Sequence, residues 1–319
     1  MTFPRFRNLA LAAALAAGVT APAMAQRVIR MVVPFGPGAV QDTIARTFNA
    51  ELGQALGATV VVENRPGAGG TVGTAQVARA TDNNTLVLAA ASHTLAGHLY
   101  SKLAYDPVKD FTGVAYIGNS GYAIAAPANL GVNNLADYVK LLKTRPGQNN
   151  YASAGNGSAT HMGMAYFLAK AGVEMQHVPM KSTGDAVNEV LAGRVQGVTS
   201  SLVGITGFKG DPRIKILAYT GDRRSKFMPE LPTVAEAGVP GYKFDSWIGV
   251  LAPSTLPKAE AEKLNAAINK VLAEPAVQER LARLGVESGA MSVDAFQQLL
   301  RADYEAAGVL VKAAGARVE

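Results

Sequence analysis

Three short segments of the chain bring glycine, proline and hydroxyl side chains together where strands are expected to end. Each segment precedes a helical pattern, so its backbone N–H groups lie at the positive end of a helix, where carboxylates and phosphates bind. One such turn alone is ordinary turn and capping chemistry, but three in one chain predict a shared anion site. The three segments are Phe35-Gly36-Pro37-Gly38-Ala39, Ser92-His93-Thr94 and Ser153-Ala154-Gly155-Asn156-Gly157-Ser158.

Signals for catalysis, metal binding and nucleotide binding are weak. His93 and His98 are five residues apart, a poor spacing for two metal ligands on one helix face, and no acidic cluster accompanies them. Ser158 and His161 have the spacing of a helix cap and its neighbour, and they leave a serine-dependent hydrolase as the enzymatic alternative. The glycine-rich run 65–70 lacks the G-x-G-x-x-G spacing and is interpreted as a turn. We therefore expect no enzyme, no cofactor and no metal site.

Short apolar runs alternate with helical patterns along the chain, which is typical of α/β proteins. The spacing of Ile44, Phe48 and Leu52, for example, predicts a helix over 40–56 that Gly57 ends. Strands are expected at 28–34, 59–62, 85–91, 113–117, 122–126, 150–153, 175–180, 196–200, 214–220 and 244–252. Helices are expected at 40–56, 71–80, 135–143, 158–171, 184–191, 256–273, 275–284 and 293–313.

The first residues have the features of a cleavable signal peptide. Arg5 and Arg7 precede an apolar stretch over 9–19, which is shorter than the about 20 residues of a membrane span. Residues 23–25 read Ala-Met-Ala, the small-x-small pattern before a cleavage site. We expect a signal peptide over 1–25, cleavage after Ala25 and a periplasmic protein, with an uncleaved anchor as the alternative.

Composition narrows the classes of protein further. The 319 residues are 49% hydrophobic and 17% charged, which excludes a disordered chain. The absence of cysteine excludes disulfides, thiolate nucleophiles and zinc sites built from Cys ligands. Cleavage removes two arginines and lowers the formal net charge from +6 to +4. Because the basic residues are scattered without aromatic residues between them, we expect no nucleic-acid partner, and the positive field favours small anions.

The length predicts two domains, although no flexible tether separates two halves of the sequence. The candidate crossings are the extended, proline-terminated segments 121–127 and 246–253. We therefore expect residues 26–122 and 251–319 to form one discontinuous domain and residues 123–250 the other. Two crossings of this kind would allow a hinged cleft.

Five motifs stand in an order that resembles one family. They read VVPFGPGAVQDTIAR at 32–46, VVENRPGAGGTVG at 61–73, YASAGNGSATHM at 151–162, ELPTVAEAGVPGY at 230–242 and WIGVLAP at 247–253. Together they resemble the Bug-type periplasmic substrate-binding proteins of tripartite tricarboxylate transporters, over nearly the whole chain after the signal peptide. The resemblance implies an α/β, two-lobed type II periplasmic-binding-protein fold with a hinged inter-domain cleft. It also implies a two-component membrane permease as partner, and we expect a monomer.

The resemblance implies a ligand site as well. Residues 35–39 and 153–158 would form opposing loops that hold a carboxylate, and residues 92–94 would also face the cleft. Family members commonly carry an aspartate at the position of Ser200, and a Tyr-Lys-Gly turn where this chain has Met180-Lys181-Ser182. The hydroxyls of Thr199 and Ser200 would instead donate to a second carboxylate.

This difference at position 200 bears on the charge of the ligand. A desolvated ammonium group needs a carboxylate partner, and Thr199 and Ser200 are neutral. We therefore expect a small organic anion without an amine, either an aliphatic di- or tricarboxylate or an aromatic acid. The expected function is capture by domain closure and delivery to the permease, and a signalling receptor with the same cleft is the alternative.

Overall fold

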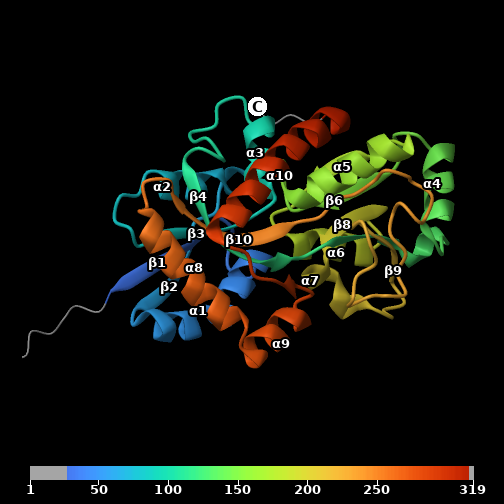
Figure 1. The fold of residues 1–319 in the computed structure, drawn as a ribbon. Helices are drawn as coiled ribbons and strands as arrows, with labels where there is room; N and C mark the ends of the chain where they lie inside the picture. The colour runs from blue at the N-terminus through green and yellow to red at the C-terminus, as the bar shows by residue number, and fades with distance from the viewer. Residues whose placement is uncertain (1–26, 316–319) are drawn as a thin grey trace, which may run out of the picture.

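The computed structural model describes residues 27–315, which form two β-sheets with helices around them (Figure 1). The predicted signal peptide and its cleavage site lie outside the described residues. Within residues 27–315, none of the helices combines the length and apolar character that a membrane crossing requires.

The first sheet contains six strands, and helices pack around it. β1 pairs in parallel with β2 and β3, whereas β10 runs antiparallel between β3 and β4. β3 is buried along its whole length because helices cover the sheet. In spatial order the strands are β11 (Glu287–Ser288), β4 (Phe111–Asn119), β10 (Trp247–Pro253), β3 (Thr85–Ala90), β1 (Val28–Val33) and β2 (Thr59–Asn64). The helices are α1 (Val40–Leu56), α2 (Thr71–Ala78), α3 (Ser92–Leu99), α8 (Lys258–Leu272), α9 (Pro275–Arg283) and α10 (Val293–Ala314). We call this sheet and its helices the first lobe.

The second lobe is built on a sheet of five strands. Alternate residues of β5 point to opposite faces: Ile124 packs in a core with α5, whereas Ala123 and Ala125 pack in a core with α6. In spatial order the strands are β7 (Gln176–Pro179), β6 (Asn150–Ser153), β8 (Gly197–Ser201), β5 (Tyr122–Pro127) and β9 (Ile214–Tyr219). The helices are α4 (Leu135–Thr144), α5 (Ala159–Ala171), α6 (Thr183–Leu191) and α7 (Leu202–Ile205). Short 3₁₀ helices occur at Ala68–Gly70, Ala128–Leu130 and Thr206–Phe208.

The predicted α/β class is confirmed, and the helix over 40–56 is found at those bounds. The sequence missed α3, which begins directly after β3 and is only eight residues long. Its segment had been expected to be a turn, because eight residues give too short a window for helical periodicity to show. This difference matters for the site, because it decides which way residues 92–94 point.

The two passages of the chain between the lobes lie side by side. The chain leaves β4 through Ser120 and Gly121, and it returns just before β10. The Ser120 backbone N–H donates to the Ser246 carbonyl oxygen at 2.9 Å. The candidate crossings 121–127 and 246–253 are mostly occupied by the strands β5 and β10. The expected boundary after residue 250 would divide β10. We propose that the second lobe instead starts at Tyr122, the first residue of β5, and ends before β10.

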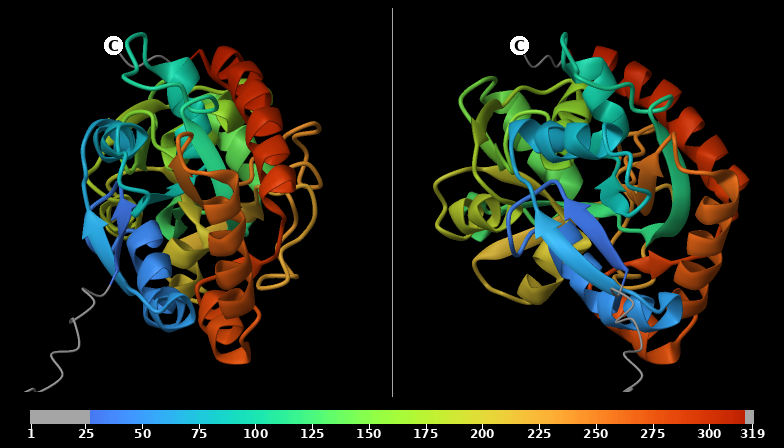
Figure 2. Two further views of the ribbon diagram at one scale, coloured as in Figure 1. Left: turned by 60° about the vertical axis from the view of Figure 1, so that its left-hand side comes forward. Right: turned by 90° about the vertical axis from the view of Figure 1, so that its left-hand side faces the viewer.

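Helix α10 contacts both lobes, although residues 251–319 were expected to belong to one domain. Its Phe296 and Leu300 pack in a core with β3 and β10 of the first lobe. Its Ala307 and Val311 pack in the core that contains α4 and α5 of the second lobe. Figure 1 shows α10 passing from the first sheet toward α5, and Figure 2 shows the same helix, in red, from two further sides.

Candidate functional site

A cavity of about 460 Å³ is lined by residues of both lobes and of the passages between them. This volume lies within the roughly 300–1,000 Å³ typical of small-molecule sites. We call this cavity the cleft. Its first-lobe lining consists of residues 35–41, 66–70, Ala90, Ser92 and Ile248. Its second-lobe lining consists of Tyr122, Ala154, residues 158–160 and 181–184, Ser201, Val203 and Gly204, and the passages contribute Ser120 and Ser246.

Three helices begin at the wall of the cleft. The first N–H groups of a helix have no partner within the helix, and they carry its positive partial charge. In α5 and α6 the capping serines, Ser158 and Ser182, accept from the third N–H group, so each cap leaves the first two N–H groups to other partners. Those first two residues line the cleft in all three helices: Val40 and Gln41 of α1, Ala159 and Thr160 of α5, and Thr183 and Gly184 of α6. The cleft is therefore suited to an anion.

The first loop, residues 35–39, is held open toward the cleft by two side chains behind it. Asp42 accepts from the Gly38 N–H at 2.9 Å, and Asn64 donates to the Phe35 carbonyl oxygen at 3.0 Å. Burial raises the pKa of Asp42, but hydrogen bonds from Arg46, Gly38 and Asn64 outweigh it and leave the pKa below its usual range. All five predicted residues of this loop line the cleft.

The second loop, residues 153–158, contributes fewer side chains than predicted. Of the six residues, Ala154 and Ser158 line the cleft. Ser153 is buried beside β7, with its Oγ 2.6 Å from His177 Nε2. Gly155 and Gly157 have positive φ angles, which turn the backbone toward α5. The predicted residues Ser153, Gly155, Asn156 and Gly157 thus shape the loop and do not line the cavity.

Ser158 and His161 do not form a nucleophile and its base. Ser158 Oγ accepts from the His161 backbone N–H at 3.2 Å and shares a hydrogen bond with Thr160 Oγ1 at 3.0 Å. The His161 ring is occupied elsewhere, because its Nδ1 accepts from the Gly157 N–H at 3.1 Å. Burial lowers the pKa of His161 to about 4. The pair is a helix cap and its neighbour.

His93 and Thr94, predicted as cleft residues, point into the first lobe instead. Because α3 begins at Ser92, only this first residue faces the cleft, and the next two rotate away from it. His93 is stacked on Tyr105, its Nε2 lies 2.8 Å from the Pro107 carbonyl oxygen, and burial lowers its pKa to about 4. Thr94 Oγ1 donates to Asp303 Oδ2 at 2.5 Å. The structure thus places these two side chains within the first lobe and not in the lining of the cleft.

Thr199 and Ser200 are also not in the cleft. Both are fully buried within β8, where Ser200 Oγ donates to the Ser201 carbonyl oxygen at 3.1 Å. The cleft is instead lined by the next residue, Ser201, at the end of β8. Its hydroxyl is buried, with the residue 4% exposed, and it has no hydrogen-bond partner among the described residues. The predicted residues lie one and two positions before Ser201. Ser200 points to the other side of the strand from Ser201, whereas Thr199 points to the same side but lies one strand repeat farther from the end of β8.

Several cleft residues were missed. The glycine-rich run 65–70 was interpreted as a turn; it contains the short 3₁₀ helix Ala68–Gly70, and residues 66–70 line the cleft. This run follows β2, and ligands of open α/β sheets bind beyond the carboxyl ends of the strands, so its position was the available signal. Ser120 and Ser246 come from the passages between the lobes, and Tyr122 begins β5 directly after one of them; the sequence alone does not show that these passages meet.

The charges that line the cleft are few. Among the residues that the structure describes, no Asp or Glu lines the cleft, and Lys181 is the one charged side chain in its lining. Among residues 27–315, no group of three or more His, Cys, Asp or Glu side chains has the arrangement of a metal site. The polar lining is otherwise made of hydroxyl groups and backbone, which bind a carboxylate by donating hydrogen bonds.

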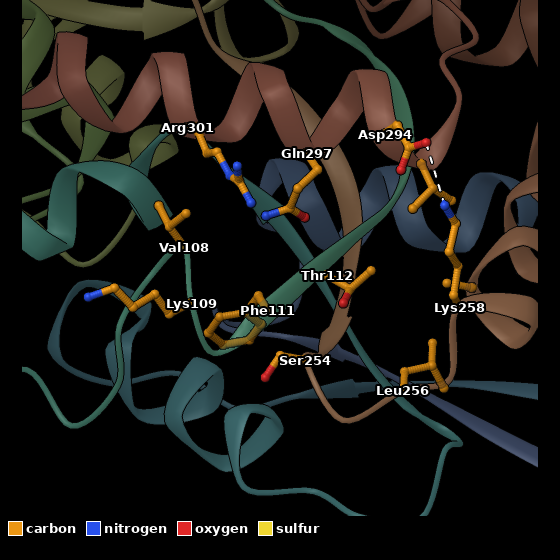
Figure 3. A pocket seen from close by; sticks show the side chains of 12 residues that line it. Val108, Lys109, Phe111, Thr112, Ser254, Leu256, Lys258, Asp294, Gln297 and Arg301 are labelled. Atoms are coloured by element: carbon orange, nitrogen blue, oxygen red, sulfur yellow. Dashed lines mark ion pairs between the residues drawn. The ribbon is translucent and has the colours of Figure 1, made fainter.

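A larger cavity of about 680 Å³ lies elsewhere on the first lobe, between β4, α8 and α10 (Figure 3). None of the residues predicted as a site lines it. Two of its three cations already have acidic partners: Lys258 lies 3.6 Å from Asp294 and Lys109 lies 3.3 Å from Asp106. The cleft is therefore the candidate functional site.

Comparison with known proteins gives a consistent result. The model of the family described as "Tripartite tricarboxylate transporter family receptor" matches residues 44–316. The chain is similar to the solved structure of R. palustris Rpa4515 with adipate, at 30% identity and a TM-score of 0.86 over 92% of this chain and 100% of that one. It is similar to periplasmic binding protein BugD, at 31% identity and 0.83 over 92% and 99%. It is also similar to MatC from Rhodopseudomonas palustris with bound malate, at 30% identity and 0.81 over 89% and 99%.

Proposed function

Because this chain belongs to the family of Bug-type tripartite tricarboxylate transporter receptors, we propose that it captures a small organic carboxylate in the cleft and delivers it to a two-component membrane permease. It is a solute-binding protein and not an enzyme, since its family and its structural neighbours are periplasmic binding proteins. The neighbours bound to adipate and malate support a carboxylate as ligand.

The convergence of α1, α5 and α6 on one cleft is the observation that carries this proposal. Each helix presents its first two residues to the cavity, and no acidic side chain opposes them. A carboxylate would accept from these N–H groups and would lie at three positive helix ends. Hydrogen bonds with a charged acceptor contribute roughly 1.5–3 kcal/mol each, so a few of them suffice for tight binding.

The same lining supports a ligand without an amine. An ammonium group enclosed in the cleft would meet Lys181 and neutral donors, and it would lose its hydration without gaining a carboxylate partner. We therefore propose an aliphatic di- or tricarboxylate or an aromatic acid. Phe35, which lines the first loop, would accommodate an aromatic ring as well as an aliphatic chain.

Capture would proceed by closure of the lobes about Ser120–Gly121 and the passage before β10. We propose that the protein is exported and cleaved after Ala25, which an intact-mass measurement on the periplasmic fraction would test. Small-angle scattering profiles of the mature protein should become more compact with ligand. Identical profiles with and without saturating ligand would contradict closure.

A thermal-shift screen of mono-, di- and tricarboxylates and aromatic acids tests the ligand class. A ligand at 100 times its Kd stabilises the folded protein by about 2.7 kcal/mol, so true ligands should raise the melting temperature clearly and without turnover. Amines and sugars serve as controls. If no carboxylate stabilises the protein, the proposed ligand class is wrong. Co-purification with a membrane permease tests delivery.

A further inference from the structure

Lys181 is a cation in the lining of the cleft. It lies in the loop between β7 and α6, directly before the capping residue Ser182. Among residues 27–315, no carboxylate lies within ion-pair distance of its ammonium group. Asp185, one turn along α6, is engaged with the cap and accepts from Ser182 Oγ at 2.8 Å. Lys181 is therefore available to an anion from outside the chain.

An unpartnered buried hydroxyl lies beside the same helix end. The Ser201 side chain lines the cleft, and its oxygen has no partner among the described residues. Gly204 lies between this strand end and α6: a Cβ atom on Gly204 would lie 2.7 Å from Ser200 Oγ, 3.2 Å from Thr183 Cγ2 and 3.5 Å from Ser201 Oγ. The Ser200 hydroxyl is already engaged, because it donates to the Ser201 carbonyl oxygen at 3.1 Å. The Ser201 hydroxyl and the first residue of α6 thus border the space next to Gly204. Leaving a buried hydroxyl without a hydrogen-bond partner costs free energy, which indicates that a bound ligand group forms this hydrogen bond.

We propose that Lys181, the first turn of α6 and Ser201 form a second anion subsite, which binds the distal carboxylate of a dicarboxylic acid. This inference rests on the proposed function, because it assumes that the loops before α1 and α5 hold the first carboxylate. Lys181 supplies a point charge, the N–H groups of Thr183 and Gly184 supply oriented donors, and Ser201 supplies a hydroxyl. All three favour the same ligand group.

The subsite selects against acids with a single carboxylate. When the cleft closes on a monocarboxylate, aliphatic or aromatic, Lys181 and Ser201 lose water and gain no acceptor in return. A dicarboxylate supplies an acceptor for both Lys181 and Ser201. The subsite therefore narrows the ligand class from small carboxylates in general to acids with two anionic groups.

Calorimetry with matched ligands tests the subsite. The probes are linear dicarboxylates from succinate to suberate, each paired with the monocarboxylate of the same chain length, such as adipate with hexanoate. The variants are Lys181→Gln and Ser201→Ala. Their controls are Lys140→Gln, an exposed lysine on α4, and Thr199→Val, which removes a buried hydroxyl of the same strand that does not line the cleft.

The wild-type protein should bind its best dicarboxylate at least about tenfold more tightly than the matched monocarboxylate. Lys181→Gln should lower dicarboxylate affinity about 10- to 100-fold, the range expected for a charged hydrogen bond, and should change monocarboxylate affinity less than about threefold. Ser201→Ala should have a smaller effect in the same direction, and both controls should leave affinity unchanged. Equal losses for the two ligand types, or no loss, would overturn the subsite while leaving the proposed function intact. Failure of the wild-type protein to bind any carboxylate would overturn both.

Discussion

His161 and His177 stack face to face, with ring centroids 4.0 Å apart and an interplanar angle of 10°. His161 lies in the first turn of α5 and accepts the Gly157 N–H, while His177 lies in β7 with its Nε2 2.6 Å from Ser153 Oγ. The stack therefore holds both ends of the second loop. Acceptance at His161 Nδ1 requires that this nitrogen carries no proton.

The stack predicts that stability decreases as the solution is acidified. Burial lowers the pKa of His161 to about 4, and burial together with the neighbouring His161 ring lowers that of His177 to about 4, from 6.5 for each. Between pH 6.5 and 4 the unfolded chain binds more protons than the folded protein, so the free energy of unfolding falls with falling pH. Thermal melting across this window should show a midpoint that drops by several degrees.

A double variant isolates this effect from other titrating groups. His161→Gln with His177→Gln replaces both imidazoles with amides that do not titrate, while His93, whose pKa burial also lowers, is retained. The decline of the melting temperature between pH 6.5 and 4 should be shallower in the double variant than in the wild-type protein. Parallel curves for the two proteins would rule out the stack as the source.

Thr94→Val should destabilise the protein and leave ligand affinity unchanged. Thr94 is fully buried and donates to Asp303, which also accepts from Trp247 Nε1 at 2.8 Å, so the hydroxyl belongs to a network that joins α3, α10 and β10. Loss of a hydrogen bond to a buried charged group costs roughly 1.5–3 kcal/mol. Denaturant unfolding measures the stability, and calorimetry measures the affinity.

Ser92→Ala is the matched comparison for Thr94→Val. Ser92 is the first residue of α3 and lines the cleft, so its loss should lower affinity more than stability. If Thr94→Val weakened binding in a protein of unchanged stability, the placement of Thr94 outside the cleft would be wrong.

The sequence predictions were accurate where the residues that determine a feature lie within one short segment. The helix over 40–56 was predicted because a periodic apolar face and Gly57, in the left-handed conformation, are both encoded within one segment. The first loop was predicted for the same reason, since the glycines and prolines of residues 35–39 are themselves the turn. The place of Ser120 and Ser246 in the cleft was not predicted. The two residues are 126 positions apart in the sequence, and they come together only in the folded chain.

The differences at residues 93–94 and 199–200 have another cause. At 93–94 the segment is the start of helix α3 and not a turn, and at 199–200 the strand was recognised, but in both places the direction of each side chain depends on the residue at which the element begins or ends. Thr199 and Ser200 precede Ser201 by two positions and one position, and only Ser201, at the end of β8, lines the cleft. Patterns of this kind place a segment to within a few residues, which is not sufficient to choose among adjacent hydroxyls.

Ser158→Ala should weaken ligand binding only modestly. Ser158 caps α5 by accepting the His161 N–H, and its loss should lower stability by about 0.5–2 kcal/mol. Because the neighbouring N–H groups of α5 remain in the cleft, affinity should fall by about 1–2 kcal/mol or less, the cost of one hydrogen bond to a charged ligand. Abolition of binding in a folded variant would show that the hydroxyl, and not the backbone, holds the ligand.

Gly121→Ala should strain the passage between the lobes. A Cβ atom at this position would overlap the hydroxyl oxygen and the Cζ atom of Tyr219, so the ring must move. Overpacking of this kind costs about 1–3 kcal/mol, measured by denaturant unfolding. The control is Gly207→Ala, where a Cβ atom would meet nothing within 4 Å. Tyr219→Leu should reduce the cost of Gly121→Ala, and an unchanged cost would show that the collision with Tyr219 is not its source.

The charges of the cleft predict rejection of amino acids. Succinate and aspartate share one carbon skeleton and differ by an ammonium group, as do glutarate and glutamate. No acidic side chain lines the cleft, and Lys181 would repel the ammonium group. A buried charge without a partner costs several kcal/mol, so calorimetry should show at least about 100-fold weaker binding for the amino acid of each pair, where 1.4 kcal/mol corresponds to tenfold.

Malate is the control for size, because it adds a neutral hydroxyl to succinate, and it should bind within about tenfold of succinate. Aspartate binding as tightly as succinate would contradict the argument from charge, whereas equal losses for malate and aspartate would mean that the cleft excludes any substituent by size.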